Sequence, residues 1–287
     1  MKEYLGTSFH TNDFGFISKL QKQLETEIPV LPPESIKKFG FKYCNGRITH
    51  LYLSNKQLET IPNSLANLTN LKLLHIHRNH LEIIPKSVLN LSNLEELSIG
   101  SNPLKEIPDW IGSLTSLKKL YLFGLELNKF PLFLKGLPLC RLALYNNRIT
   151  KIPNWINTLS YLEDLTIGNN KITKIPEELC QLSYLKEFSA FGNTITSIPE
   201  CLSGLKQLEE LILHENEIVE LPKSISKLKN LSILSLYGNN LCDLPDTVVE
   251  LKSLRTIWLH KNPNLKLTVE IKSWLKYQED KGCNVRY

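Results

Sequence analysis

A 23-residue period runs through most of this 287-residue chain and constrains its fold more than any other feature. The shared pattern is L-x-x-L-x-L-x-x-N-x-L-x-x-I-P-x-x-L-x-x-L-x-x, and self-similarity at such a period is typical of repeat architectures. Its ninth position falls at Lys56, Asn79, Asn102, Leu125, Asn147, Asn170, Asn193, Asn216, Asn239 and Asn262. Nine full copies and a truncated tenth predict a stack of similar coils instead of one globular core.

This repeat resembles the leucine-rich repeat, and its I-P-x-x-L-x-x-L half is similar to the short intracellular type of that family. That type occurs in Ras-binding scaffold proteins and in many bacterial and archaeal repeat proteins. The resemblance covers about Ile48 to Leu265. It implies an α/β solenoid, a horseshoe with a concave parallel β-sheet and about ten repeats. It also implies a protein-interaction function, with a small GTPase or another signalling protein as the partner.

The residues inside one copy favour the same fold. Alternate residues of a strand point to opposite faces, so Leu74 and Ile76 should point inward while His75 and His77 point outward. The ninth-position Asn carries both a donor and an acceptor, and it can satisfy backbone groups where the chain leaves the strand. The Pro fixes φ, and the L-x-x-L spacing then suits one turn of helix or a 3₁₀ segment on the outer side.

Both ends of the stack need caps, since a terminal coil would expose its leucines and a sheet edge. We expect an N-terminal cap over 1–47, repeats over 48–265 and a helical cap over 266–287. The first cap should hold a helix over 13–24 with Asp13 as N-cap, a short helix in PPESIKKFG and a hairpin turning at Asn45-Gly46. In the last cap, TVEIKSWLKYQEDKG predicts a helix that ends at Gly282 and places Trp274 over the last coil.

The positions that should face outward from the sheet are rich in aromatic and histidine side chains. The concave sheet usually carries the function of such solenoids, and aromatic side chains give a large contact area at low entropic cost. The predicted partner-binding residues are Tyr52, His75, His77, Tyr121, Phe123, Tyr145, Phe191, His214, Tyr237, Trp258 and His260, with Lys119 and Arg141 beside them. The alternative is that cross-strand aromatic pairs only stabilise the sheet, by ~0.2–1 kcal/mol each.

Charge is also sorted along the repeats. Basic residues gather near the fourth and fifth copies, at Lys118, Lys119, Arg141 and Arg148. Acidic residues gather in the sixth to eighth copies, at Glu163, Asp164, Glu187, Glu209, Glu210, Glu215 and Glu217. A split field of this kind would orient a charged partner and speed its encounter. The alternative is that these charges only provide ordinary surface solubility.

One copy departs from the pattern. It carries Leu125 where its neighbours carry Asn, and the next ninth position, Asn147, follows after 22 residues instead of 23. Leucine cannot replace the hydrogen bonds of an amide, so the row of asparagines is interrupted there. Either the array tolerates one degenerate copy, or the change alters the local curvature and shapes a pocket beside Tyr121, Phe123 and Tyr145.

Several classes of function are excluded by composition and motifs. The net charge of +5 comes without a basic block of the kind that nucleic-acid binders carry, and no segment is apolar enough to cross a bilayer. Phosphate loops, GxSxG and HExxH are absent. No carboxylate or thiol is clearly placed to complete a metal site with His50, His75, His77 or His80. We therefore predict a monomeric, non-enzymatic module without cofactor or metal that binds another protein on the concave face.

The six cysteines are scattered singly, at Cys44, Cys140, Cys180, Cys201, Cys242 and Cys283. Without paired spacing or an export signal, reduced thiols in a cytoplasmic protein are expected. Two other functions stay open. The chain could be the recognition subunit of an effector or enzyme complex, such as a ubiquitin-ligase system, whose catalytic domain would need a separate chain. It could also be a structural repeat protein without a dedicated ligand.

Overall fold

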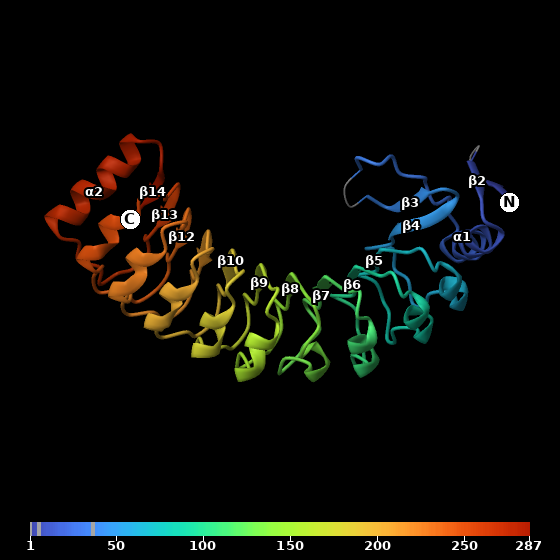
Figure 1. Ribbon diagram of the computed structural model, residues 1–287, viewed down its shortest axis with the longest axis horizontal. Coiled ribbons are helices and arrows are strands. Elements are labelled where there is room, and N and C mark those ends of the chain that lie inside the picture. Colours follow the sequence, from blue (N-terminus) through green and yellow to red (C-terminus); the bar gives the residue numbers. More distant parts are fainter. Residues whose placement is uncertain (1, 5–6, 36–37) are drawn as a thin grey trace. The chain divides into compact units, whose positions relative to one another are not determined.

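The computed structural model describes residues 2–4, 7–35 and 38–287. The chain forms two compact units, the first made of Met1–Leu125 with Pro131–Leu139 and the second of Glu126–Phe130 with Cys140–Tyr287. The division falls in the irregular copy, directly after Leu125. Each unit is a stack of coils in which a short strand lies on one side and a short 3₁₀ helix on the other (Figure 1). The predicted solenoid fold class is therefore confirmed.

The first unit contains an N-terminal hairpin and helix followed by the first repeats. Its elements are β1 (Lys2–Tyr4), β2 (Thr7–Phe9), α1 (Thr11–Leu24), β3 (Gly40–Cys44), β4 (Arg47–Tyr52), η1 (Asn63–Asn67), β5 (Leu73–His75), η2 (Lys86–Asn90), β6 (Glu96–Ser98), η3 (Asp109–Ser113), β7 (Lys119–Tyr121) and η4 (Leu132–Leu134). Strands β4 to β7 are parallel, and each is displaced from the last by one repeat, so that Leu51 pairs with Leu74 and Leu74 with Leu97. Strand β3 is antiparallel to β4, as the Asn45-Gly46 turn predicts.

The second unit continues the same pattern to the C-terminus. Its elements are β8 (Arg141–Ala143), η5 (Asn154–Thr158), β9 (Asp164–Thr166), η6 (Glu177–Gln181), β10 (Glu187–Ser189), η7 (Glu200–Gly204), β11 (Glu210–Ile212), η8 (Lys223–Lys227), β12 (Ile233–Ser235), η9 (Asp246–Glu250), β13 (Thr256–Trp258), α2 (Val269–Asp280) and β14 (Asn284–Arg286). All of its strands are parallel, and β14 pairs with β13.

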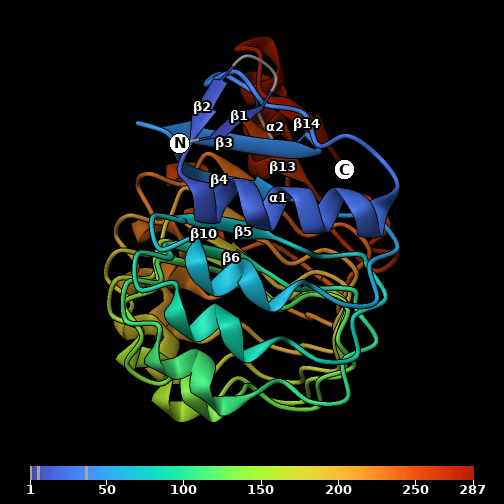
Figure 2. The ribbon, with the colours of Figure 1, turned by 90° about the vertical axis from the view of Figure 1, so that its right-hand side faces the viewer.

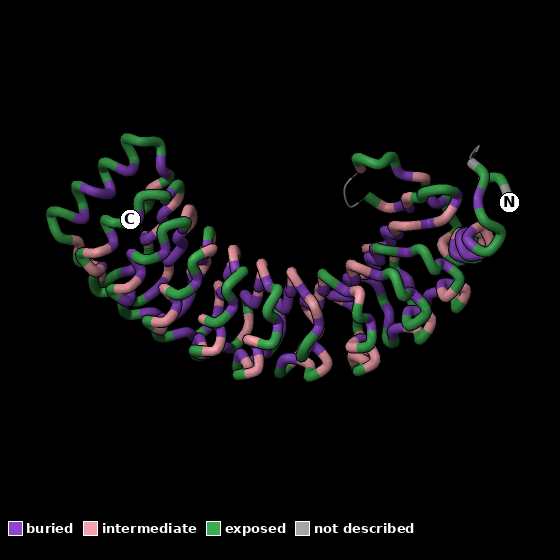
Figure 3. Tube along the Cα trace, viewed as in Figure 1, coloured by how far each residue is buried: buried purple, intermediate pink, exposed green. Residues whose placement is uncertain are grey.

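The core of each unit is the layer of aliphatic side chains between the strands and the 3₁₀ helices. The buried residues that supply these side chains are purple on the backbone trace of Figure 3. Leu74 of β5 and Ile76, directly after this strand, are fully buried, and so are Leu65, Leu68 and Leu71 on the opposite side of the coil. Burial of one such side chain stabilises the fold by ~1.5–3 kcal/mol. Since each coil packs on its neighbours, the leucines of one repeat are buried by the next.

The ninth-position asparagines connect the backbones of adjacent coils. Asn170 accepts from Ile149 N at 2.9 Å, and it donates to Leu144 O and Ile167 O at 3.0 Å each. Equivalent bonds are made by Asn79, Asn102, Asn193, Asn216, Asn239 and Asn262. Asn147 accepts from Leu127 N and donates to Leu144 O. The side chain of Asn102 accepts a hydrogen bond from Leu81 N. The side chain of Leu125 has no acceptor, so it cannot do the same for Leu104 N.

Asn170→Ala should lower the free energy of unfolding by ~1–3 kcal/mol, because it leaves buried backbone groups without a partner. Lys171→Ala, one residue further along at an exposed position, should change it by less than ~0.5 kcal/mol. Chemical denaturation of both variants compares the two values. Equal stabilities would show that the asparagine does not hold the turn.

The N-terminal helix differs from its prediction at its first turn. Helix α1 begins at Thr11, and its N-cap is His10, whose side chain accepts from Asn12 N at 3.4 Å. Asp13 was predicted as the N-cap, and this is wrong. It lies inside the helix, fully buried, where its carboxylate accepts from Arg47 Nε at 3.1 Å and Ile48 N at 2.8 Å. The carboxylate therefore joins α1 to the start of β4, and the two elements lie side by side (Figure 2).

The other cap predictions have mixed outcomes. The helix proposed in PPESIKKFG includes Ile36 and Lys37, which lie outside the described residues. The first four residues of this segment form a turn in which Ser35 N donates to Pro32 O at 3.0 Å. At the other end, α2 buries Trp274 as predicted, and Gly282 follows it with φ of 90°. Strands β1, β2 and β14 were not predicted.

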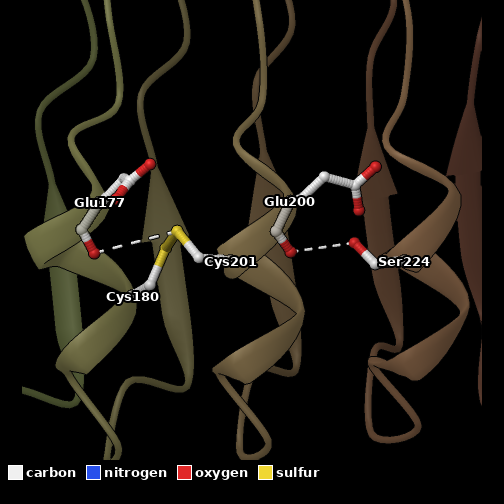
Figure 4. The surroundings of a disulfide bond; sticks show 5 residues. All are labelled: Glu177, Cys180, Glu200, Cys201 and Ser224. Carbon is white, nitrogen blue, oxygen red and sulfur yellow. Dashed lines mark hydrogen bonds between the residues drawn. A yellow bond between two sulfur atoms is a disulfide. The ribbon is translucent and has the colours of Figure 1, made fainter.

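A disulfide between Cys180 and Cys201 corrects the expectation that all six thiols are free (Figure 4). The two residues are 21 apart in sequence, yet their Cα atoms are 5.8 Å apart because the repeat places η6 beside η7. A spacing of about one period is therefore a pairing signal in a solenoid, although it looks unpaired in the linear sequence. All six cysteines lie in the described part of the chain, and Cys44, Cys140, Cys242 and Cys283 are free thiols.

Thiol titration of the unfolded protein should find four thiols without reductant and six after reduction. The bond closes a loop of about one repeat, so Cys201→Ser should lower the free energy of unfolding by about 3 kcal/mol. Cys242→Ser, at an exposed free thiol, is the matched control and should change it little. Six titratable thiols before reduction would contradict the assignment.

Candidate functional site

The third, fifth and seventh positions of the repeat share one face of the sheet, because side chains alternate along a strand. We call it the sheet face. In the second unit its third-position row is Arg141, Asp164, Glu187, Glu210, Ile233 and Thr256. The fifth-position row is Ala143, Thr166, Ser189, Ile212, Ser235 and Trp258. The seventh-position row is Tyr145, Gly168, Phe191, His214, Tyr237 and His260. Predicted site residues occur in all three rows.

Four of these rings form one continuous stack, which we call the ring column: Phe191, His214, Tyr237 and His260. The centroids of Phe191 and His214 are 4.9 Å apart, those of His214 and Tyr237 4.3 Å, and those of Tyr237 and His260 4.8 Å. Successive ring planes differ by 16°, 10° and 11°. Because neighbouring strands lie ~4.8 Å apart, the sheet itself spaces the rings for stacking. All four rings are half-buried and reach solvent.

A glycine makes room for the first ring of the column. A Cβ added at Gly168 would lie 2.4 Å from Phe191 Cε1, so the ring occupies the space of the missing side chain. Gly100 and Phe123 repeat this arrangement in the first unit, where the added Cβ would lie 2.7 Å from the ring. In both cases the Phe follows the Gly by 23 residues. A Gly followed after 23 residues by a Phe is therefore the sequence signal for a Phe ring that packs over the Gly of the preceding copy.

Other side chains lie beside the ring column and contact its members. Trp258 lies beside Tyr237 at 6.2 Å, tilted by 56°, and the guanidinium of Arg286 lies 5.5 Å from the Trp258 ring. His214 Nδ1 is 3.2 Å from Ser235 Oγ. Burial lowers the pKa of His214, although Glu215 acts in the opposite direction. This imidazole is therefore neutral at neutral pH, and it contributes an uncharged surface.

The third-position row carries a concentration of negative charge, and we call Asp164, Glu187 and Glu210 the acidic row. The three residues pair directly across β9, β10 and β11. Arg141 Nε lies 2.6 Å from Asp164 Oδ2 and neutralises one end of the row. Burial, followed by the charges of Asp164 and Glu210, raises the pKa of Glu187. Burial and the charge of Asp164 also raise the pKa of Glu210. The folded chain therefore holds like charges together at neutral pH.

Glu187→Gln should raise the stability at pH 7 by ~0.2–1 kcal/mol, because like charges directly opposite each other destabilise a sheet. The pKa of Glu187 is higher in the folded than in the unfolded state, so stability is lost as pH rises through the folded value. The gain should vanish below the unfolded pKa of about 4.3. Denaturation at pH 7 and at about pH 3.5 measures both. Glu177→Gln, exposed on η6, is the control, and an equal gain there would contradict the repulsion.

In the first unit the predicted site residues are largely occupied by contacts within the unit. Tyr52 is buried in a small cluster with Leu31 and Leu73. His75 is 4% exposed, and its Nε2 lies 2.7 Å from Glu96 Oε1. Lys119 Nζ lies 3.3 Å from the other carboxylate oxygen of Glu96. Glu96, which the sequence analysis did not single out, therefore organises this face.

The rings of His77 and Phe123 lie next to each other in the first unit. His77 Nδ1 lies 3.0 Å from Ser54 Oγ and 2.8 Å from Ser98 Oγ, and its ring is 5.5 Å from that of Phe123. Phe123 was expected to stand outside the buried residues, and this is wrong, since only 6% of it is exposed. The reason is the space that Gly100 leaves.

The residues of the pocket suggested beside Leu125 fall in different units. Tyr121 and Phe123 belong to the first unit, whereas Tyr145 belongs to the second. A joint role for these three residues therefore stays a prediction. Within the described residues, no group of three or more His, Cys, Asp or Glu side chains could hold a metal ion.

Comparison with known proteins identifies relatives of this chain. None of the curated proteins compared matches it. Among solved structures, a leucine-rich repeat protein of Leptospira interrogans is 28% identical, with a TM-score of 0.63, over 84% of this chain and 72% of that one. The ectodomain of the Arabidopsis thaliana receptor kinase GASSHO1/SCHENGEN3, in complex with CASPARIAN STRIP INTEGRITY FACTOR 2, is 32% identical, with a TM-score of 0.69, over 81% and 30%. The plant peptide hormone receptor RGFR1, in complex with RGF2, is 26% identical, with a TM-score of 0.62, over 76% and 40%.

The chain thus spans less than half the length of either plant receptor structure. Among the described residues, no helix has the length and apolar character needed to span a membrane. The leucine rich repeat family matches residues 69–127, 160–218 and 206–263, which together cover more than half of the chain. Domains of this family generally mediate protein–protein interactions and are generally non-enzymatic. The chain belongs to the leucine-rich repeat family.

Proposed function

We propose that this protein is a non-enzymatic interaction module that docks a protein partner on the sheet face of its second unit. The ring column is the observation that carries the proposal. It places four half-buried rings from successive repeats in one contiguous row. Aromatic side chains held rigidly in such a row offer contact area without further loss of side-chain freedom, and they are enriched among the residues that dominate binding energy.

The related structures support a protein or peptide as the partner. One plant relative is in complex with CASPARIAN STRIP INTEGRITY FACTOR 2, and the peptide hormone receptor is in complex with RGF2. Both relatives are much longer than this chain, so the identity of their partners is not transferred. A signalling role, with a small GTPase as partner, is a proposal from the family resemblance alone.

Capture from a native lysate tests this function with matched variants. The face variant is Phe191→Ala with Tyr237→Ala, which interrupts the ring column twice. The control is Glu177→Ala with Glu178→Ala, on 3₁₀ helix η6 at the opposite side of the coil. A stoichiometric partner should be retained by wild type and control and lost by the face variant, with circular dichroism showing that all three are folded. A partner lost only by the control would place the binding surface on the 3₁₀ side.

The predictions of a cytoplasmic location, a monomer, and no binding to nucleic acid or membranes stay predictions. The Cys180–Cys201 bond bears on the first of them, because disulfides persist in oxidising compartments and are rare in the cytosol. Thiol titration of protein isolated from its native source without reductant would address the compartment directly.

A further inference from the structure

The acidic row and the ring column face each other in the copies of β10 and β11, where Glu187 and Glu210 hold the third position and Phe191 and His214 the seventh. The third and seventh positions are four residues apart on each strand, which corresponds to ~13 Å at ~3.3 Å per residue. Between them lies the fifth-position row, where Thr166, Ser189 and Ile212 pair across β9, β10 and β11. These side chains are short or of medium size. This strip of the sheet face therefore has an acidic edge and an aromatic edge, separated by a row of smaller side chains.

Negative charge dominates the acidic edge even after its internal ion pairs are considered. Arg141 is 2.6 Å from Asp164, and Lys186 Nζ is 2.8 Å from Glu163 Oε2. In the copies of β8 to β11, the residues at the second and third positions carry a net charge of −3 when all are ionised. The charged ones are Arg141, Glu163, Asp164, Lys186, Glu187, Glu209 and Glu210. Burial, and after it the charge of Asp164, raises the pKa of both Glu187 and Glu210.

The aromatic edge has a different character from the acidic one. Its rings are stacked against each other and remain half-exposed, and burial lowers the pKa of His214, which favours the uncharged imidazole. Apolar side chains would pack there, whereas a cation would gain most at the carboxylates across the strip. One partner segment can satisfy both edges only if it alternates the two kinds of side chain.

We infer that the partner docks through an extended segment in which Lys or Arg alternates with apolar residues, its cations on the acidic row and its apolar side chains on the ring column. Successive side chains of an extended chain point to opposite sides, so this alternation fits the two edges. The inference rests on the proposed function and adds the chemistry of the partner. Basic side chains would also relieve the repulsion between Glu187 and Glu210, so binding and charge compensation favour the same partner.

Selection from a random 16-residue peptide library displayed on phage tests this inference while the natural partner is still unidentified. Three immobilised variants accompany the wild type. The face variant is Phe191→Ala with Tyr237→Ala, and the charge variant is Glu187→Gln with Glu210→Gln. The control is Glu177→Gln with Glu200→Gln, which removes two exposed carboxylates from η6 and η7. Selected peptides are then synthesised, and their affinities are measured at low and high salt.

The expected result is a set of peptides that need the ring column and carry alternating Lys or Arg. These peptides should bind the charge variant with an affinity about tenfold lower, or lower still, than wild type. Added salt should lower their affinity for wild type, because the contact is electrostatic. The control should bind them normally. Peptides that need the ring column but are neutral or acidic, or that bind the charge variant equally well, would overturn this inference and leave the proposed function standing. Selection that yields no peptide dependent on the ring column would overturn both.

Discussion

Asp13→Ala should lower the free energy of unfolding by about 3 kcal/mol, because it removes one partner of a buried ion pair. The carboxylate is fully buried and bonds both the Arg47 guanidinium and the backbone N–H of Ile48. Alanine would leave the Ile48 N–H without its acceptor at the first residues of β4. Since α1 covers this end of the first unit, the loss should loosen the cap that protects the first coil's leucines.

Chemical denaturation of the full chain measures this effect. Asp13→Asn should lose less than Asp13→Ala, since the amide oxygen can still accept one of the two hydrogen bonds. Glu27→Ala removes an exposed carboxylate close to the end of the same helix, and it should change the stability by less than ~0.5 kcal/mol. If Asp13→Ala were as mild as Glu27→Ala, the contact between α1 and β4 would not hold the cap in place.

The repeat predicted the fold because its residues have a separate physical role at each position. Leu74 and Ile76 point inward while Asn79 bonds the backbone of its own coil and the preceding one, as their residue types indicate. The period of 23 residues sets which residues become neighbours. The strand register, the hairpin at Asn45-Gly46 and the cap helix with Trp274 follow from the same local signals.

Features that depend on contacts between coils were harder to predict. Cys180 and Cys201 look unpaired until the repeat is used to place them on adjacent coils. Asp13 has the residue type and position of an N-cap, and only the packing of β4 on α1 gives its carboxylate other donors.

The candidate site shows the same limit. The aromatic residues of the sheet face were found from sequence, but their stacking depends on the space above Gly168 and on the spacing of the strands. The sequence pattern also predicted that the sheet-face side chains of both units are exposed alike. In the structure Tyr52 and His75 are buried, whereas the rings of the second unit reach solvent.

Disruption of the ring column should cause the largest loss of binding of any change to the second unit's sheet face. Phe191→Ala with Tyr237→Ala removes two aromatic anchors, and truncating one such anchor often costs ~2 kcal/mol or more. Together the two changes should reduce affinity by at least about 30-fold. Both side chains are half-buried on the sheet face, outside the aliphatic core, so the repeats should stay folded.

Gly168→Val tests the geometry of the column without deleting a ring. A side chain at this position would collide with Phe191, whose ring must then turn away from His214. We expect weaker binding, together with a changed near-ultraviolet circular dichroism signal from the displaced aromatic group. Gly204→Val, at an exposed position in η7 where an added Cβ would meet only Cys180 O at 3.7 Å, is the matched control and should bind normally.

Calorimetric titration of the captured partner into purified protein is the most direct measurement of the proposed binding surface. Wild type and the Glu177→Ala, Glu178→Ala control should bind with equal affinity. Phe191→Ala with Tyr237→Ala should show no measurable heat at the same concentrations while its circular dichroism spectrum still shows a folded protein. If this face variant binds like wild type and the control on η6 does not, the sheet face of the second unit is not the binding surface.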